Sequence, residues 1–221
     1  MRAILFSIIL IFIVSFVFLF ISFQRSLTYF YTSSKALENR INAMISLYND
    51  ISNDAKRAVE IVAKRACVAA INYVITNGIP LNSSNETLVE LMVNGTINGN
   101  LQPLMENSNL ESWKETLEYL ASLQDFFVVI NFTQIKIEPF DSFNLNISYK
   151  IKVEISDKKI KANLTKEKFD SVLLNVENLE DPLYPLNTYG RVVNVIKKSP
   201  HWPNYYSDNT TNLKDDLNNS C

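Results

Sequence analysis

The feature that most constrains this chain is an unbroken run of apolar residues near its N-terminus. Residues 3–23 include no charged residue, no proline and no glycine. A helix rises ~1.5 Å per residue, so a run of this length spans the ~30 Å hydrocarbon core of a bilayer. A cleavable signal peptide is the competing interpretation, but its apolar region usually covers ~7–15 residues and ends at small residues. Here the run ends in Phe23, Gln24 and Arg25, so we expect an uncleaved single-pass signal-anchor.

The orientation of this anchor follows less from charge than from N-glycosylation motifs. Arg2 and Arg25 flank the run and do not distinguish its two sides. Beyond the run lie eight Asn-x-Ser/Thr triplets, which begin at Asn82, Asn85, Asn94, Asn131, Asn146, Asn163, Asn209 and Asn218. Chance excess in an Asn-rich chain is the alternative explanation. We expect a glycoprotein of the cell membrane with a cytoplasmic N-terminus and an extracytoplasmic C-terminal domain.

Composition and turn-forming residues divide the rest of the chain into predicted parts. The formal net charge is −2, so no basic field favours nucleic acid as a partner. The predicted parts are a cytoplasmic stub (1–2), the transmembrane anchor (3–23), a long helix or stalk (24–78), a polar loop region (79–107), an α+β extracytoplasmic domain (108–203) and a mobile tail (204–221).

The predicted long helix carries a heptad-like apolar seam, typical of a coiled coil. Its members are Leu37, Ile41, Met44, Tyr48, Ile51, Ala55, Ala58 and Val62. The seam has two interpretations: it pairs with another copy or another envelope protein, or it packs on the chain's own domain. We expect packing on the domain in the second half and a protruding stalk in the first. Gly78 and Pro80 predict the end of the helix.

Alternation of apolar and polar residues predicts an antiparallel β-meander of about four strands. It is clearest over residues 143–155 and recurs over 126–137, with a shift near Thr133 that predicts a bulge. Residues 160–164 and 169–176 are the other two predicted strands. A capping box at 108–111 begins a packed helix, and its apolar stripe is Leu110, Trp113, Leu117, Leu120 and Leu123. The predicted class is α+β: a transmembrane helix continuing into a long helix, then this sheet.

The residues that carry chemistry are sparse. Cys67 and Cys221 are the two cysteines; they form a disulfide outside the cell, or Cys67 is a small buried apolar residue in its helix. The single histidine, His201, lies between Pro200 and Trp202, with no carboxylate nearby in sequence to orient it as a base. There is no Cys/His cluster for a metal and no glycine loop for phosphate. We therefore expect no catalytic residues, cofactor, metal or small-molecule partner, and no enzyme.

The order of these parts resembles the type IV pilin-like, membrane-anchored surface proteins of archaea and bacteria. The resemblance covers residues 3 to about 176 and lies in the architecture: an apolar helix running into a long helix, with an antiparallel sheet packed on it. Such proteins carry a basic leader ending in Gly and a Glu early in the apolar run. Met1, Arg2 and Ala3 include no Gly, and the run has no acid. The number of Asn-x-Ser/Thr motifs and the high content of Ile, Lys and Asn resemble those of archaeal surface proteins.

These observations lead to a functional hypothesis with two alternatives. The first is a structural or interaction protein of the cell envelope, pilin-like or associated with an appendage, whose partners are membrane lipid and either its own copies or another envelope protein. The second is a ligand-binding or sensory ectodomain acting through a membrane partner, which predicts a sizeable apolar pocket between sheet and helix. The third is an anchored hydrolase, which predicts acidic residues clustered around a cleft.

Overall fold

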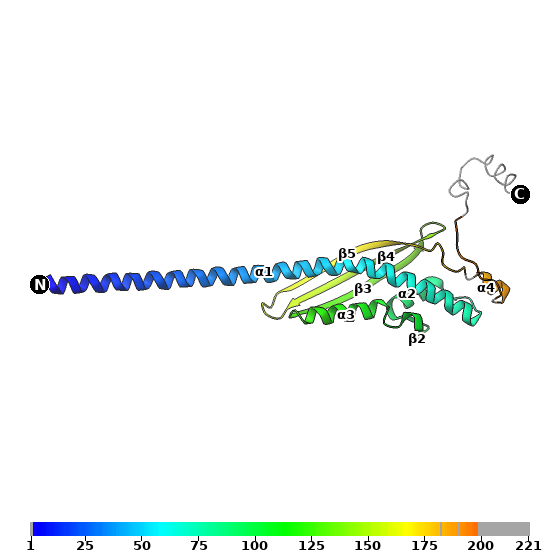
Figure 1. Cartoon of the computed structure of the whole chain (residues 1–221), viewed down its shortest axis with the longest axis horizontal. Coiled ribbons are helices and arrows are strands. Elements are labelled where there is room, and N and C mark those ends of the chain that lie inside the picture. Colours follow the sequence, from blue (N-terminus) through cyan, green and yellow to red (C-terminus); the bar gives the residue numbers. More distant parts are fainter. Residues whose placement is uncertain (1, 182, 190, 199–221) are drawn as a thin grey trace, which may run out of the picture.

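The dominant element is one continuous helix, α1 (Arg2–Asn77), 76 residues long. The computed structural model describes residues 2–181, 183–189 and 191–198. Figure 1 shows the first half of α1 standing away from the rest of the chain, while its second half lies along a small domain. The helix ends as predicted, because Gly78 adopts φ 67° and its N–H donates to the Val74 carbonyl over 2.9 Å. The predicted continuity of the apolar helix and the long helix is confirmed.

A three-stranded antiparallel sheet packs against the second half of α1. Its strands are β3 (Phe126–Pro139), β4 (Asn144–Asp157) and β5 (Asn163–Asn175), in the order β3-β4-β5. In the central strand β4 every second side chain from Ile147 onward is buried, as its alternation predicts, and Leu145 before it is half-buried. The predicted bulge is present: the β3–β4 register shifts between Thr133 and Lys136.

The prediction of four strands is wrong, since the third and fourth predicted strands are a single strand, β5. Ile160 belongs to the turn before it, where Lys161 has φ 54°. Charged residues on the helix-facing side of this edge strand hide its alternation. Lys166 lies over the Tyr48 ring of α1 at 4.9 Å, and Lys168 pairs with Asp170 at 2.8 Å. An edge strand tolerates such residues because its outer side remains in water.

Residues 79–107, predicted as a polar loop region, are folded into short elements. They form α2 (Ser84–Asn94), a hairpin of β1 (Thr96–Ile97) and β2 (Asn100–Leu101), and the 3-10 turn η1 (Pro103–Met105). This stretch contributes five buried apolar or glycine positions to the core, which are Leu91, Met92, Gly95, Ile97 and Met105. They are too few and too far apart to stand out among the surrounding Asn and Ser residues.

The second predicted helix is α3 (Leu110–Ser122), and it begins one residue later than the predicted capping box. Asn109, not Ser108, is the N-cap, and its side-chain oxygen accepts the Ser112 N–H over 2.8 Å. The predicted stripe holds only for its first half: Leu110 is buried, whereas Leu120 and Leu123 are exposed. Ala121 is buried in their place, because the end of α3 turns a different side toward the sheet.

The helices cover one face of the sheet and leave the other face open. α1 lies over β5 and β4, while α3 and α2 lie over β3. The core between these layers includes Ala55, Val59 and Ala66 of α1 together with Ile130, Tyr149 and Val153 of the sheet. Small residues on α1 let the helix approach the sheet closely. A last short helix, α4 (Leu183–Thr188), lies near the end of α1.

Candidate functional site

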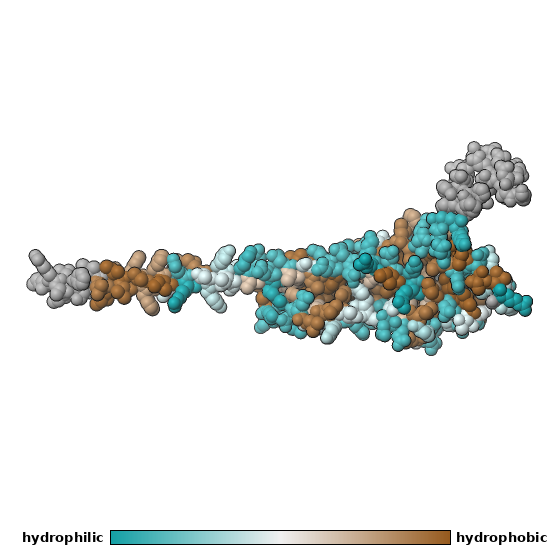
Figure 2. Space-filling view, viewed as in Figure 1, coloured by the Kyte–Doolittle hydropathy of each residue, from teal (hydrophilic) through white to brown (hydrophobic). Residues whose placement is uncertain are grey.

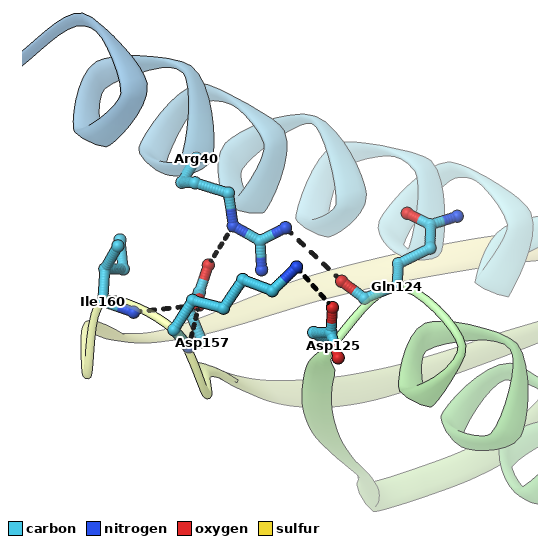
Figure 3. Close-up of polar contacts among 6 residues, drawn as sticks. Arg40, Gln124, Asp125, Asp157 and Ile160 are labelled. Atoms are coloured by element: carbon cyan, nitrogen blue, oxygen red, sulfur yellow. Dashed lines mark hydrogen bonds and ion pairs between the residues drawn. The ribbon is translucent and has the colours of Figure 1, made fainter. Parts of the chain in front are cut away.

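A buried ion pair joins α1 to the domain where the helix first meets the sheet. Arg40 Nε lies 2.6 Å from Asp157 Oδ2; the side chain of Asp157 is 0% exposed and that of Arg40 is 25% exposed. The other carboxylate oxygen, Oδ1, accepts the N–H groups of Lys159 (2.7 Å) and Ile160 (3.2 Å). Figure 3 shows Asp157 held between the helix and its own turn. Asp157 is thus satisfied from two sides, which a buried carboxylate requires.

The α3–β3 turn is the third segment of this junction, because it contacts both Arg40 and Lys159. Arg40 Nη1 is 3.5 Å from the Gln124 carbonyl oxygen (Figure 3). Its guanidinium carbon lies 4.4 Å from the centroid of the Phe126 ring. Lys159 Nζ is 2.6 Å from Asp125 Oδ2. The junction therefore fixes the stalk, the start of β3 and the β4–β5 turn relative to one another.

The electrostatics of this junction favour two ionised carboxylates. The hydrogen bond from Arg40 holds the pKa of Asp157 below its ordinary value, against the opposing effect of burial. The pKa of Asp125 is lowered by its hydrogen bond to Lys159 and by the charge of that lysine. Carboxylates held in the ionised form are poor proton donors, and each of these two is occupied by a structural partner. Sequence reasoning missed the pair because Arg40 and Asp157 are 117 residues apart.

A hollow of about 440 Å³ lies between α2 and the bulged part of β3. Its lining mixes polar and apolar residues: Asn85, Glu86, Val89, Glu90, Val93, Asn94 and Ile135. Glu90 is already engaged by the β1–β2 hairpin, since it accepts bonds from Thr96 Oγ1 (2.6 Å), Gly99 N (2.8 Å) and Asn98 N (3.1 Å). These bonds, Thr96 foremost, lower the pKa of Glu90. Glu90 thus acts as a structural acceptor.

A second set of shallow hollows follows the side of α1 that the sheet leaves uncovered. Val68 and Leu104 line two of them, of about 220 and 330 Å³, beside Arg65. Arg65 Nη2 donates to the Leu104 carbonyl over 3.0 Å and so ties η1 to the helix. Val68 and Leu104 are exposed. This side is an open apolar surface rather than an enclosed ligand cavity.

The sequons that lie within the described residues are at accessible positions. Asn82, Asn85 and Asn94 are exposed around α2, and Asn131 and Asn163 are exposed on the open face of the sheet. Asn146 of the central strand is half-buried on that face. Asn209 and Asn218 lie outside the described residues. Solvent access is a requirement for glycosylation and not evidence of it, so modification stays a prediction.

The apolar seam divides at the point where α1 enters the domain. Met44, Ile51, Ala55, Ala58 and Val62 are buried within the chain, and Tyr48 is half-buried against the core. Leu37 and Ile41 precede them and are exposed. The expected division into a packed second half and a protruding first half agrees with this placement. Self-association through the seam stays a prediction, and only its first part has side chains free to take part.

The remaining candidate residues are not brought together. Cys67 is buried in α1, and Cys221 lies outside the described residues, as does His201, so the disulfide stays a prediction. Within residues 2–181, 183–189 and 191–198 no three His, Cys, Asp or Glu side chains are grouped in a way that would hold a metal ion. The predicted absence of an enzymatic activity stays a prediction.

Comparisons with known proteins give no family assignment. No protein-family model, no curated protein and no solved structure matches this chain. The N-terminal part of α1 is long and apolar enough to cross a membrane, and its apolar stretch is not buried by the rest of the described chain. The inference about function therefore depends on the architecture of the chain itself.

Proposed function

We propose that this chain is a single-pass, membrane-anchored structural or interaction protein of the cell envelope. In this proposal α1 holds the domain on the extracytoplasmic side of the cell membrane. The observation that carries it is the continuity of α1, which is a bare apolar rod at one end and part of a protein core at the other. A soluble domain gains nothing from an apolar run of about 30 Å of helix (residues 3–23) left in water, whereas a bilayer removes that surface from water.

Two further observations support this proposal. Tyr29, Phe30 and Tyr31 follow the apolar run and are exposed, as suits side chains at the lipid headgroups. The six sequons within the described residues are accessible at least in part, which is compatible with passage through a glycosylating compartment. The type IV pilin-like resemblance points to the same class of protein, since those proteins also present a sheet domain on a long helix.

The topology can be tested on whole cells that produce the full chain. A membrane-impermeant maleimide should label Leu101→Cys, an exposed position in the β1–β2 hairpin, without prior lysis. Mass spectrometry of the native protein should find the N-terminal apolar run retained and sugars on exposed sequons. A mature chain that begins after Phe23, or a hairpin label that appears only after lysis, would contradict the proposal.

Self-association is the second part of the proposal, and it assigns the contact to the exposed beginning of the seam. Leu37, Ile41 and the neighbouring Ile45 are exposed on α1 just before it enters the domain. The double variant Leu37→Asp/Ile41→Asp should lower the mass of the detergent-solubilised protein. Ile61→Asp is the matched control, because Ile61 is exposed on α1 outside the seam. An unchanged mass in the double variant would contradict pairing at this place.

The alternative functions have weaker support. A ligand-binding ectodomain needs an apolar pocket between sheet and helix, and the hollow between α2 and β3 has four polar residues among seven lining residues. A hydrolase needs acidic groups poised for proton transfer, and Glu90 in that hollow is engaged by three hairpin bonds. We therefore base the proposal on the anchored architecture.

A further inference from the structure

The end of the domain that faces the anchor has several large apolar side chains in the open. Tyr119, Leu120 and Leu123, at the end of α3, are 63%, 48% and 65% exposed. Leu123 is four residues from Tyr119 and three from Leu120, so its side chain lies on the same side of the helix as each of them. Phe127, four residues further on in β3, is 57% exposed. Figure 2 shows apolar atoms at the end of the domain nearest the stalk.

Positive charge lies beside these apolar side chains. The β4–β5 turn presents Lys158, Lys159 and Lys161, all exposed, and the Lys158 N–H donates to the Asp125 carbonyl at the start of β3 over 3.2 Å. The carboxylates of this end are already paired, Asp125 with Lys159 and Asp157 with Arg40. Among the described residues neither Lys158 nor Lys161 forms a close ion pair with a carboxylate, although the charge of Lys158 contributes to lowering the pKa of Asp125.

We propose that this end of the domain docks on the anionic headgroups of the bilayer that holds α1. We call it the basal surface and define it by Tyr119, Leu120, Leu123, Phe127, Lys158 and Lys161. Apolar side chains that enter the headgroup region, combined with lysines that attract anionic lipid, are the two components of peripheral membrane binding. The basal surface has both components, and it is the end of the domain that faces the anchor in Figure 1.

The length of the stalk makes such docking possible. Seventeen residues of α1 separate Phe23 from Arg40, which is about 25 Å at the rise of a helix. Part of this length lies among the headgroups if Tyr29, Phe30 and Tyr31 mark the interface, and about 13 Å then separates Tyr31 from Arg40. The basal surface lies beside the helix axis, so inclining α1 lowers it toward the lipid. Membrane-spanning helices incline by about 20° on average and by up to about 40°.

Side-chain hydroxyl groups in residues 24–33 of α1 favour a bend of the helix between the apolar run and the domain. Thr28 Oγ1 donates to the Gln24 carbonyl over 2.9 Å, and Thr32 Oγ1 donates to the Thr28 carbonyl over 2.9 Å. Ser33 Oγ bonds similarly to the Phe30 carbonyl. Such side-chain bonds to the preceding turn compete with the helix's own bonds and often bend helices. The segment between anchor and domain is thus the part of α1 best suited to change the inclination of the domain.

This proposal depends on the membrane anchoring proposed above, so the experiment first tests anchoring. The full chain with Cys67→Ala and Cys221→Ser is placed in nanodiscs that hold one chain each. An environment-sensitive NBD fluorophore is attached at Leu123→Cys in the basal surface. The control label is at Leu101→Cys, which is 56% exposed in the hairpin away from the anchor. The quencher is a lipid with a spin label on its headgroup, in discs with or without phosphatidylglycerol.

We expect several-fold stronger quenching at position 123 than at position 101 in discs with phosphatidylglycerol. The difference should shrink in Lys158→Ser/Lys161→Ser, and also in about 1 M salt, where the Debye length is about 3 Å. Equal quenching at both positions, or quenching that neither change affects, would overturn the proposal. A second set of discs is assembled with two chains each. Shielding of the label that appears only in these discs would assign the basal surface to a second copy of the chain and would also overturn the proposal. A chain that fails to enter the discs would refute the anchoring itself.

Discussion

The indole N–H of Trp113 on α3 donates to the carboxylate of Asp54 on α1, with 2.9 Å between Nε1 and Oδ2. The Trp113 ring also packs against Phe132 of β3, with 5.7 Å between the ring centroids. One side chain thus connects three elements that are far apart in sequence. A double-mutant cycle of Trp113→Phe and Asp54→Ala should give a coupling energy of about 0.5–1 kcal/mol in thermal unfolding. Additive effects of the two substitutions would show that the hydrogen bond contributes nothing to stability.

The Arg40–Asp157 junction predicts a stability that depends on pH. Because the folded pKa of Asp157 lies below its unfolded value of about 3.9, its ionised form stabilises the fold above that value. This contribution is lost as the pH falls from about 4 through the folded pKa. Asp157→Asn should therefore lower the melting temperature at pH 7 and flatten its dependence on pH below about 4. The measurement is circular dichroism of the full chain in detergent.

Asp125→Asn is the matched control for this prediction. Asp125 also pairs with a cation, but its side chain is 51% exposed and its pair with Lys159 is in contact with water. Exposed pairs contribute little, so this substitution should change the melting temperature much less than Asp157→Asn. Equal effects of the two substitutions would contradict a special role for the buried pair.

The core under α1 and α3 should respond strongly to a cavity. Ile130 of β3 is fully buried, so Ile130→Ala should destabilise the domain by about 2–5 kcal/mol through lost burial and the void it leaves. Leu173→Ala, on the open face of β5, removes a similar side chain from an exposed position and should cost less than about 0.5 kcal/mol. Chemical denaturation in detergent measures both. A small effect at Ile130 would mean that the α1–sheet layer does not pack as described.

Substitutions at two glycines near the β1–β2 hairpin distinguish the effect of steric crowding from the effect of backbone strain. Gly95 and Gly99 have φ 75° and 76°, a conformation that costs an L-residue about 1–2 kcal/mol. A Cβ at Gly95 would lie 2.9 Å from Asn109 Nδ2 and 3.2 Å from Met105, whereas a Cβ at Gly99 would meet open space. Gly95→Ala should therefore destabilise the protein clearly more than Gly99→Ala, because it also disturbs the N-cap of α3. Equal losses in thermal unfolding would contradict this difference.

Sequence patterns predicted the features that repeat regularly along the chain. The continuity of α1, its end before Gly78, and the bulge near Thr133 all follow from apolar periodicity and residue conformation, and all three are confirmed. The pattern predicts two strands where the structure has the single strand β5, because Lys166 and Lys168 interrupt the alternation on the side facing α1. At an edge, long cationic side chains reach water from positions that would be apolar in a central strand.

The elements that position the candidate surfaces were harder to predict. The junction depends on Arg40 and Asp157 meeting across most of the chain, and no local pattern encodes that contact. The basal surface arises because α3 turns Ala121, rather than Leu120 or Leu123, toward the sheet. Periodicity predicts that a helix has an apolar side; it does not predict which apolar residues a neighbouring layer will leave uncovered.

The sharing of α1 between anchor and domain also determines the order in which this protein assembles. Residues such as Ala55 and Ala66 leave the ribosome about a hundred residues before Val172 and Leu174 of β5, which complete the layer against them. Contacts so distant in sequence close late in folding. The newly made helix therefore lacks its cover until the last strand is made and, under the membrane anchoring proposed above, is held in the bilayer during this time. Synthesis that stalls before β5 would leave a chain whose α1 has an uncovered apolar side, the kind of intermediate that aggregates or is recognised by chaperones.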